Sequence, residues 1–106
     1  MKRVVITGIG AVTAFGKTWK DVKAAFQRKQ NAVQAKTEWA ERYPELGANL
    51  GAEIHNYTPP AHWNRKQLRS LGRVSQFAVE AAELALANAN LLDENGNVIQ
   101  TAKNAA

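Results

Sequence analysis

The chain has 106 residues, of which 45% are hydrophobic and 22% are charged, and its formal net charge is +5. This composition excludes wholesale disorder, because disordered chains combine few apolar residues with long polar tracts. Cysteine is absent, which excludes a disulfide framework, a thiolate metal site and a cysteine nucleophile within these residues. The positive charge is compatible with an acidic partner, although an excess of solvated lysine and arginine gives the same balance.

The first expected element is a strand at residues 4–6. Val4, Val5 and Ile6 are consecutive β-branched residues, which is typical of a strand buried on both faces of a covered sheet. This apolar run is far shorter than the roughly 20 residues of a membrane span, and it lacks the flanking pattern of a secretory signal. We therefore expect a cytoplasmic protein without membrane contact.

A helix is expected over residues 18–28. Thr18 is placed to cap it, with Asp21 three residues later, as in a capping box. Apolar residues recur at helical spacing from Trp19 to Phe26 and define one face. Lysines occupy the opposite face, so this helix is expected to be amphipathic.

Residues 31–57 carry weaker signals. A short helix is expected to begin at Thr37 and to end before Pro44 and Gly47. A short strand is expected at residues 52–54, and the two prolines that follow at 59 and 60 indicate a turn.

The strongest helical pattern runs from Asn64 to Asn90, where apolar residues recur three or four positions apart. A single helix of that length would measure about 40 Å. Its second half is rich in alanine, which lets a neighbouring backbone approach closely. A polar turn at residues 95–96 is expected to lead into another element at residues 98–99.

These elements describe an α/β arrangement with at most two strands. An isolated pair of strands is marginally stable, and a long amphipathic helix needs a sheet surface along its length. We therefore expect residues 1–106 to form an incomplete domain.

The glycines after the first strand invite a dinucleotide-binding interpretation, in which a pyrophosphate approaches a helix N-terminus. Thr13 stands where the third glycine of that motif belongs, and the next helix begins too late. The acidic residue expected about 20 positions later is also missing. Gly8, Gly10 and Gly16 are therefore expected to serve backbone packing and turning. A nucleotide-binding oxidoreductase fragment remains an alternative.

Two stretches resemble one family. The opening "RVVITGIGAVTAFG", followed by "TWKDVKAAF", is similar to the N-terminus of the β-ketoacyl-[acyl-carrier-protein] synthases, the condensing enzymes of fatty acid synthesis. The stretch "RKQLRSLGRVSQFAVEAAELALANANL" resembles the basic segment and alanine-rich helix of the members of types I and II. Ala14 stands where the family often has proline, and Gly72 and Val74 replace an aspartate and a phenylalanine, so the departures concern the subfamily.

The resemblance implies a thiolase-like fold with α-β-α-β-α layers, of which residues 1–106 would be the N-terminal portion of one half-domain. It implies an acyltransferase that joins an acyl thioester to malonyl-[acyl carrier protein] with loss of carbon dioxide, and that works as a homodimer without cofactor or metal. A cysteine and two histidines carry this chemistry in the family. Cysteine is absent here, and His55 and His62 do not match those histidines, so no catalytic residue is expected in this chain. The chain alone is expected to be inactive.

The resemblance also implies a docking site. In the family a basic stretch at the start of the long helix docks the acidic acyl carrier protein, and Lys66 and Arg69 match the docking positions. Arg65 and Arg73 thicken this patch, and Lys66, Arg69 and Arg73 are expected to share one helix face. An ordinary solvated face is the alternative interpretation.

A non-enzymatic module that binds an acidic protein through the basic helix also remains open. Nucleic acid is not expected as the partner, because no aromatic residues are interleaved with the basic cluster and no recognition motif is present.

Overall fold

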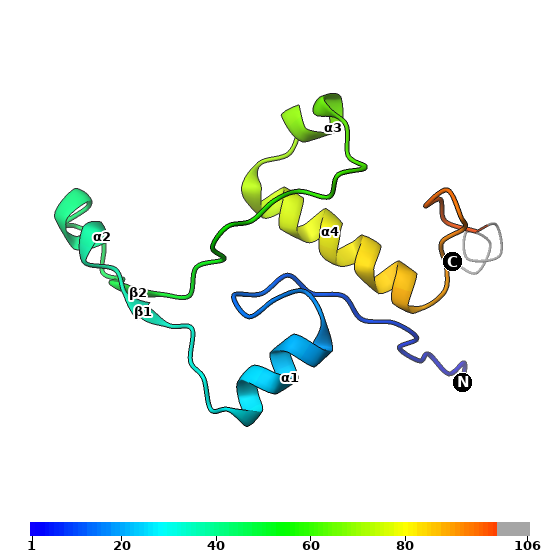
Figure 1. The fold of residues 1–106 in the computed structure, drawn as a ribbon, viewed down its shortest axis with the longest axis horizontal. Helices are drawn as coiled ribbons and strands as arrows, with labels where there is room; N and C mark the ends of the chain where they lie inside the picture. Colours follow the sequence, from blue (N-terminus) through cyan, green and yellow to red (C-terminus); the bar gives the residue numbers. More distant parts are fainter. Residues whose placement is uncertain (100–106) are drawn as a thin grey trace. The chain divides into compact units, whose positions relative to one another are not determined.

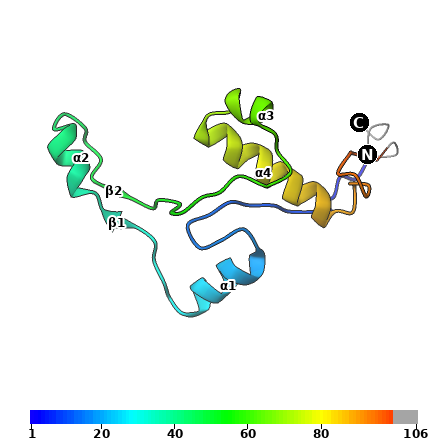
Figure 2. The ribbon, with the colours of Figure 1, turned by 45° about the horizontal axis from the view of Figure 1, so that its top comes forward.

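The computed structural model describes residues 1–99, which contain four helices and two short strands (Figures 1 and 2). The chain divides into two compact units. One comprises Thr13–Thr58, and the other comprises Met1–Val12 together with the described residues from Pro59 onward.

Helix α1, Trp19–Gln27, follows a tight turn in the unit of residues 13–58. In this turn Thr13 and Gly16 exchange backbone hydrogen bonds, and Gly16 has a φ of 132°, a conformation that favours glycine. The predicted cap is confirmed, because the Thr18 hydroxyl accepts a hydrogen bond from the backbone N–H of Asp21 at 3.2 Å. The helix buries Ala25 but leaves most of its apolar face exposed.

The same unit holds a small antiparallel sheet of β1, Gln34–Ala35, and β2, Leu50–Gly51. Helix α2, Thr37–Arg42, lies between the strands in the chain and ends before Pro44, as predicted. The strand expected at residues 52–54 is wrong by two residues. The ladder pairs Gln34 with Gly51 and Ala35 with Leu50, so β2 lies just before the expected segment.

The buried strand expected at residues 4–6 is absent from the described part of the chain. Val4, Val5 and Ile6 are 94%, 74% and 84% exposed and belong to no ladder. A strand requires hydrogen-bonded neighbours, and no segment within residues 1–99 pairs with these residues. Their β-branched side chains therefore remain uncovered.

The single long helix expected from Asn64 to Asn90 is also wrong, because the structure divides it into α3, Arg65–Arg69, and α4, Arg73–Asn88. Gly72 adopts extended backbone angles, φ −69° and ψ 171°, and precedes α4 as its N-cap residue. Glycine disfavours a helix interior by about 1 kcal/mol relative to alanine. The break at residues 70–72 separates the basic start of this region from its alanine-rich part.

The N-terminal segment runs along α4 in both views (Figures 1 and 2). A Cβ atom added to Gly8 would lie 2.7 Å from the Cβ of Ala89, and one added to Gly10 would lie 2.8 Å from the Cβ of Leu84. The backbone N–H of Ile9 also donates to Asn88 Oδ1 at 3.1 Å. The expectation that this helix lets a neighbouring backbone approach closely is confirmed.

Beyond α4 the predicted polar turn is present. The Asp93 carboxylate accepts the backbone N–H groups of Asn95 and Asn97, both at 2.9 Å, and Gly96 has a φ of 80°. The element expected at residues 98–99 is limited to an isolated antiparallel bridge between Val98 and Leu92.

Candidate functional site

The basic helix α3 is held by a capping box. The Asn64 side chain accepts the backbone N–H of Gln67 at 2.8 Å, and the Gln67 side chain accepts the backbone N–H of Asn64 at 2.9 Å. A helix of five residues is too short to form by itself in water. The capping box is therefore an important local stabilisation of α3.

Arg65, Lys66 and Arg69 make up what we call the basic α3 surface. All three are exposed, and none forms an ion pair with another residue in the range 1–99. Arg73 instead begins α4, where its guanidinium lies 5.5 Å from the centre of the Phe77 ring. The single helix face expected for Lys66, Arg69 and Arg73 is therefore wrong, because the break at residues 70–72 places Arg73 on another helix.

Substituting Asn64 with alanine is expected to destabilise α3 by about 1 kcal/mol, because it removes the side-chain half of the capping box. Amide hydrogen exchange of residues 65–69 measures this loss. Thr18→Ala removes a cap of the same kind from α1 and serves as the control, since it should leave α3 exchange unchanged. Equal exchange of α3 in wild type and Asn64→Ala would show that the cap does not hold this helix.

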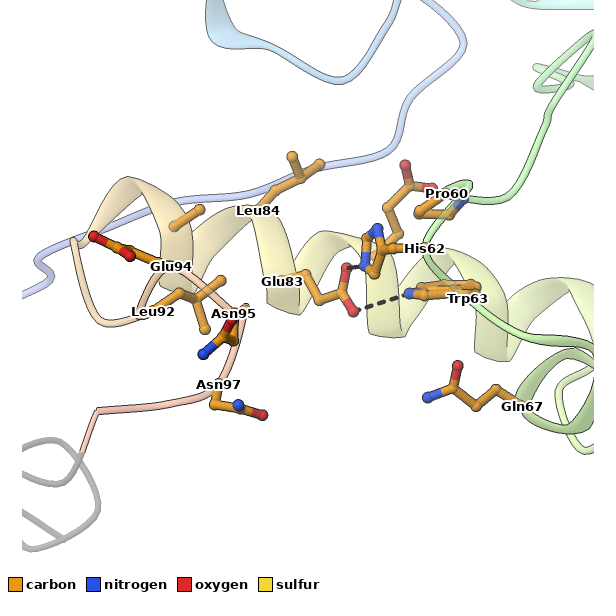
Figure 3. Close-up of a pocket in the computed structure, with 13 residues that line it drawn as sticks. Pro60, His62, Trp63, Gln67, Glu83, Leu84, Leu92, Glu94, Asn95 and Asn97 are labelled. Atoms are coloured by element: carbon orange, nitrogen blue, oxygen red, sulfur yellow. Dashed lines mark hydrogen bonds and ion pairs between the residues drawn. The ribbon is translucent and has the colours of Figure 1, made fainter.

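An open cavity of about 680 Å³ lies beside α4 (Figure 3). At its wall the Glu83 carboxylate accepts a hydrogen bond from Trp63 Nε1 at 2.9 Å and pairs with His62 Nε2 at 3.0 Å. Sequence reasoning missed this contact, because no local pattern links residues 20 positions apart on different elements. The other lining residues are carboxylates, amides and small or apolar side chains: Pro60, Gln67, Glu80, Leu84, Ala87, Leu92, Glu94, Asn95, Gly96 and Asn97.

The two histidines are exposed, as expected. The His62 side chain is 67% exposed, and the His55 side chain is 60% exposed with its Nδ1 atom 3.7 Å from the Glu53 carboxylate. Residues 1–99 contain no group of three or more side chains arranged to hold a metal ion. Within the same range, no helix combines the length and apolarity needed to cross a bilayer.

Comparisons with curated proteins and with solved structures place this chain among known proteins. No family model matches it. The curated 3-oxoacyl-[acyl-carrier-protein] synthase 2 of Synechocystis sp. is 29% identical in an alignment of 106 positions, gaps included, that covers 94% of this chain and 25% of that protein. The enzyme of the same name from Staphylococcus aureus strain N315 is 34% identical over 98 residues, covering 91% of this chain and 22% of that protein. Nodulation protein E of Rhizobium meliloti is 32% identical over 99 residues, covering 93% of this chain and 24% of that protein.

The chain is also similar to a solved structure. The crystal structure of a β-ketoacyl synthase from Burkholderia phymatum STM815 matches with a TM-score of 0.78 and 46% sequence identity, over 89% of this chain and 23% of that chain. The elements described above thus form part of a thiolase-like α/β fold, which confirms the fold class expected from the sequence.

The resemblance to the β-ketoacyl-[acyl-carrier-protein] synthases is confirmed by these matches. The chain spans about a quarter of the length of the curated relatives it matches.

Proposed function

We propose that this chain forms part of a β-ketoacyl-[acyl-carrier-protein] synthase, an acyltransferase that joins an acyl thioester to malonyl-[acyl carrier protein] with loss of carbon dioxide. The observation that carries this proposal is the likeness to the Burkholderia β-ketoacyl synthase, at 46% identity and a TM-score of 0.78 over 89% of this chain. The names of the curated relatives, 3-oxoacyl-[acyl-carrier-protein] synthase 2, support the same reaction.

The share of this chain in the reaction is structural support and docking. The chain contains no cysteine, so it lacks the nucleophile that accepts the acyl group in such a condensation. Residues 1–106 then serve as the N-terminal portion of a thiolase-like half-domain in a cytoplasmic homodimer. The exposure of Val4, Ile6 and Trp19, at 94%, 84% and 67%, supports a role within a larger packed fold.

Docking of the acidic acyl carrier protein falls to the basic α3 surface. Lys66 and Arg69 contribute most, and Arg65 and, from α4, Arg73 add positive charge. The support is electrostatic, because three exposed cations lie within five residues and no acidic side chain shares the helix. Such a surface steers an acidic partner and raises the encounter rate. Its effect weakens as salt screens the charges.

The glycines of the N-terminal region have structural roles in this proposal. Gly8 and Gly10 let the backbone pack directly on α4, and Gly16 supplies the turn before α1. The space a nucleotide phosphate would need beside Gly10 is taken up by the α4 backbone at Ala81 and Ala85.

Two assays with the isolated chain test the proposed function. Incubation with acyl- and malonyl-loaded carrier protein should give no ketoacyl product, whereas a titration against malonyl-[acyl carrier protein] should show binding that weakens as salt is raised. Product formation would contradict the proposal that the catalytic groups lie outside residues 1–106. Absence of binding at low salt would contradict the docking role.

A non-enzymatic module that binds an acidic protein is the alternative, since the basic α3 surface and the lack of cysteine suit it as well. The intact mass of the protein isolated from its source separates the two. We expect a mass well above the 11.6 kDa of these residues, whereas a mass equal to it would favour the binding module. A nicotinamide cofactor titration, expected to show no binding, tests the nucleotide-binding alternative.

A further inference from the structure

We infer that Glu83 is a positioning residue for the basic α3 surface, which it holds in place through Trp63 and His62. This inference rests on the proposed docking function and adds to it a side chain that does not itself contact the partner.

One carboxylate contacts two successive residues just before α3 (Figure 3). Glu83 Oε1 accepts from Trp63 Nε1 at 2.9 Å, and Glu83 Oε2 lies 3.0 Å from His62 Nε2. Glu83 belongs to α4, whereas His62 and Trp63 immediately precede the cap residue Asn64. The two contacts therefore connect α4 to the point in the chain where α3 begins.

The bond to Trp63 is the stronger of the two contacts. The Trp63 residue is only 8% exposed and the Glu83 side chain is 36% exposed, and a hydrogen bond from a buried donor to a charged acceptor is worth more than one between exposed neutral groups. The His62 side chain is 67% exposed, and an ion pair in such a position contributes little. The Trp63 indole is thus the main connection.

A tightly packed interface does not fix α3, so these bonds matter for its orientation. None of the five residues of α3 is buried. A cavity of about 220 Å³ lies next to α3, lined by Trp63, Gln67, Ser70, Leu71, Val79 and Glu83. At the far end of α3 one further bond reaches α4, from Gln76 Nε2 to the Leu71 carbonyl at 3.1 Å. Hydrogen bonds at its two ends therefore orient α3 and the cations it carries.

Glu83→Ala distinguishes a positioning role of Glu83 from a simple effect of its charge on partner binding. Glu83→Ala removes a negative charge from the neighbourhood of the basic α3 surface, which by itself would strengthen binding of an acidic partner. Because the substitution also releases α3, we expect it to raise the Kd for malonyl-[acyl carrier protein] at low salt by about three- to tenfold. A tenfold rise corresponds to about 1.4 kcal/mol.

Four further variants separate the loss of the hydrogen bond from the loss of charge. Glu83→Gln removes the same charge but keeps an oxygen that accepts from Trp63 Nε1, so its affinity should stay within about twofold of wild type. Trp63→Phe keeps the ring but removes the donor, and should weaken binding as Glu83→Ala does. The double variant Glu83→Ala/Trp63→Phe should bind no more weakly than either single one, because both remove the same bond. Glu94→Ala removes another carboxylate of the same cavity and should not weaken binding.

Equal or tighter binding by Glu83→Ala than by Glu83→Gln would overturn the inference. If wild type itself fails to bind the carrier protein, the proposed docking function is wrong. Amide exchange then still tests whether Glu83 positions α3. Exchange of residues 64–71 should accelerate in Glu83→Ala and Trp63→Phe but not in Glu83→Gln, while residues 76–88 of α4 keep their protection. Unchanged exchange of α3 in all variants would overturn the positioning role.

Discussion

In the proposed β-ketoacyl synthase, reversing the charges of Lys66 and Arg69 to glutamate should raise the KM for malonyl-[acyl carrier protein] by about tenfold or more at low ionic strength, a change of at least about 1.4 kcal/mol. The double reversal changes the charge of α3 by four units, because each cation becomes an anion. An acidic partner is then repelled where it was attracted, and like charges at an interface are costly.

Two controls separate docking from folding and catalysis. Reaction with a small acyl thioester that has no carrier protein should be little changed, and the effect on KM should shrink as salt is added. Reversal of Lys20 and Lys23 on α1 makes the same change of charge outside α3 and should leave KM nearly unaffected. Equal losses with carrier-bound and small substrates would count against a docking role for Lys66 and Arg69.

The Gly10→Ala substitution is expected to lower the free energy of unfolding by about 1–3 kcal/mol, the usual cost of forcing an extra carbon into a filled space. The new Cβ would overlap the backbone of α4 at Ala81 and Ala85. Both contacts are backbone atoms of a regular helix, so they cannot move aside as a flexible side chain could. Urea unfolding, with amide exchange of α4 as a local readout, measures the effect.

Gly47→Ala provides the matched comparison. A Cβ at Gly47 meets no atom within 4 Å, and this glycine has no positive φ, so the same substitution should change stability by no more than about 0.5 kcal/mol. Equal stability of the two variants would mean that residues 8–10 do not pack on α4. The packing role proposed for the N-terminal glycines would then be lost.

Caps and turns were predictable because they depend on neighbours in the chain. Thr18 caps α1 three residues from its donor, and α2 ends before Pro44, which cannot supply a helical N–H. The turn after α4 follows from Asp93 and Gly96, whose roles are local in the same way. The resemblance carried by the opening glycines and the basic stretch also led to the family that the comparisons confirmed.

The division of the predicted long helix was harder to foresee. Leu68, Leu71 and Val74 are spaced three apart, so the apolar pattern continues through the break and favours one helix. Gly72 was the opposing signal, but an isolated glycine is tolerated in many helices. In the structure α3 ends at Arg69, and Gly72 adopts extended backbone angles before α4 begins at Arg73.

The remaining features depend on residues that meet only in the folded chain. Local pattern was sufficient for the caps, the turns, the basic stretch and the family resemblance, since each involves residues a few positions apart. The packing of Gly8 and Gly10 on α4, the lack of a partner for residues 4–6 and the bond between Glu83 and Trp63 emerge only in three dimensions. The contacts of Gly8, Gly10 and Glu83 join residues 20 to 81 positions apart, and residues 4–6 would need a partner strand that is also distant in the chain; no local propensity encodes a contact of that range.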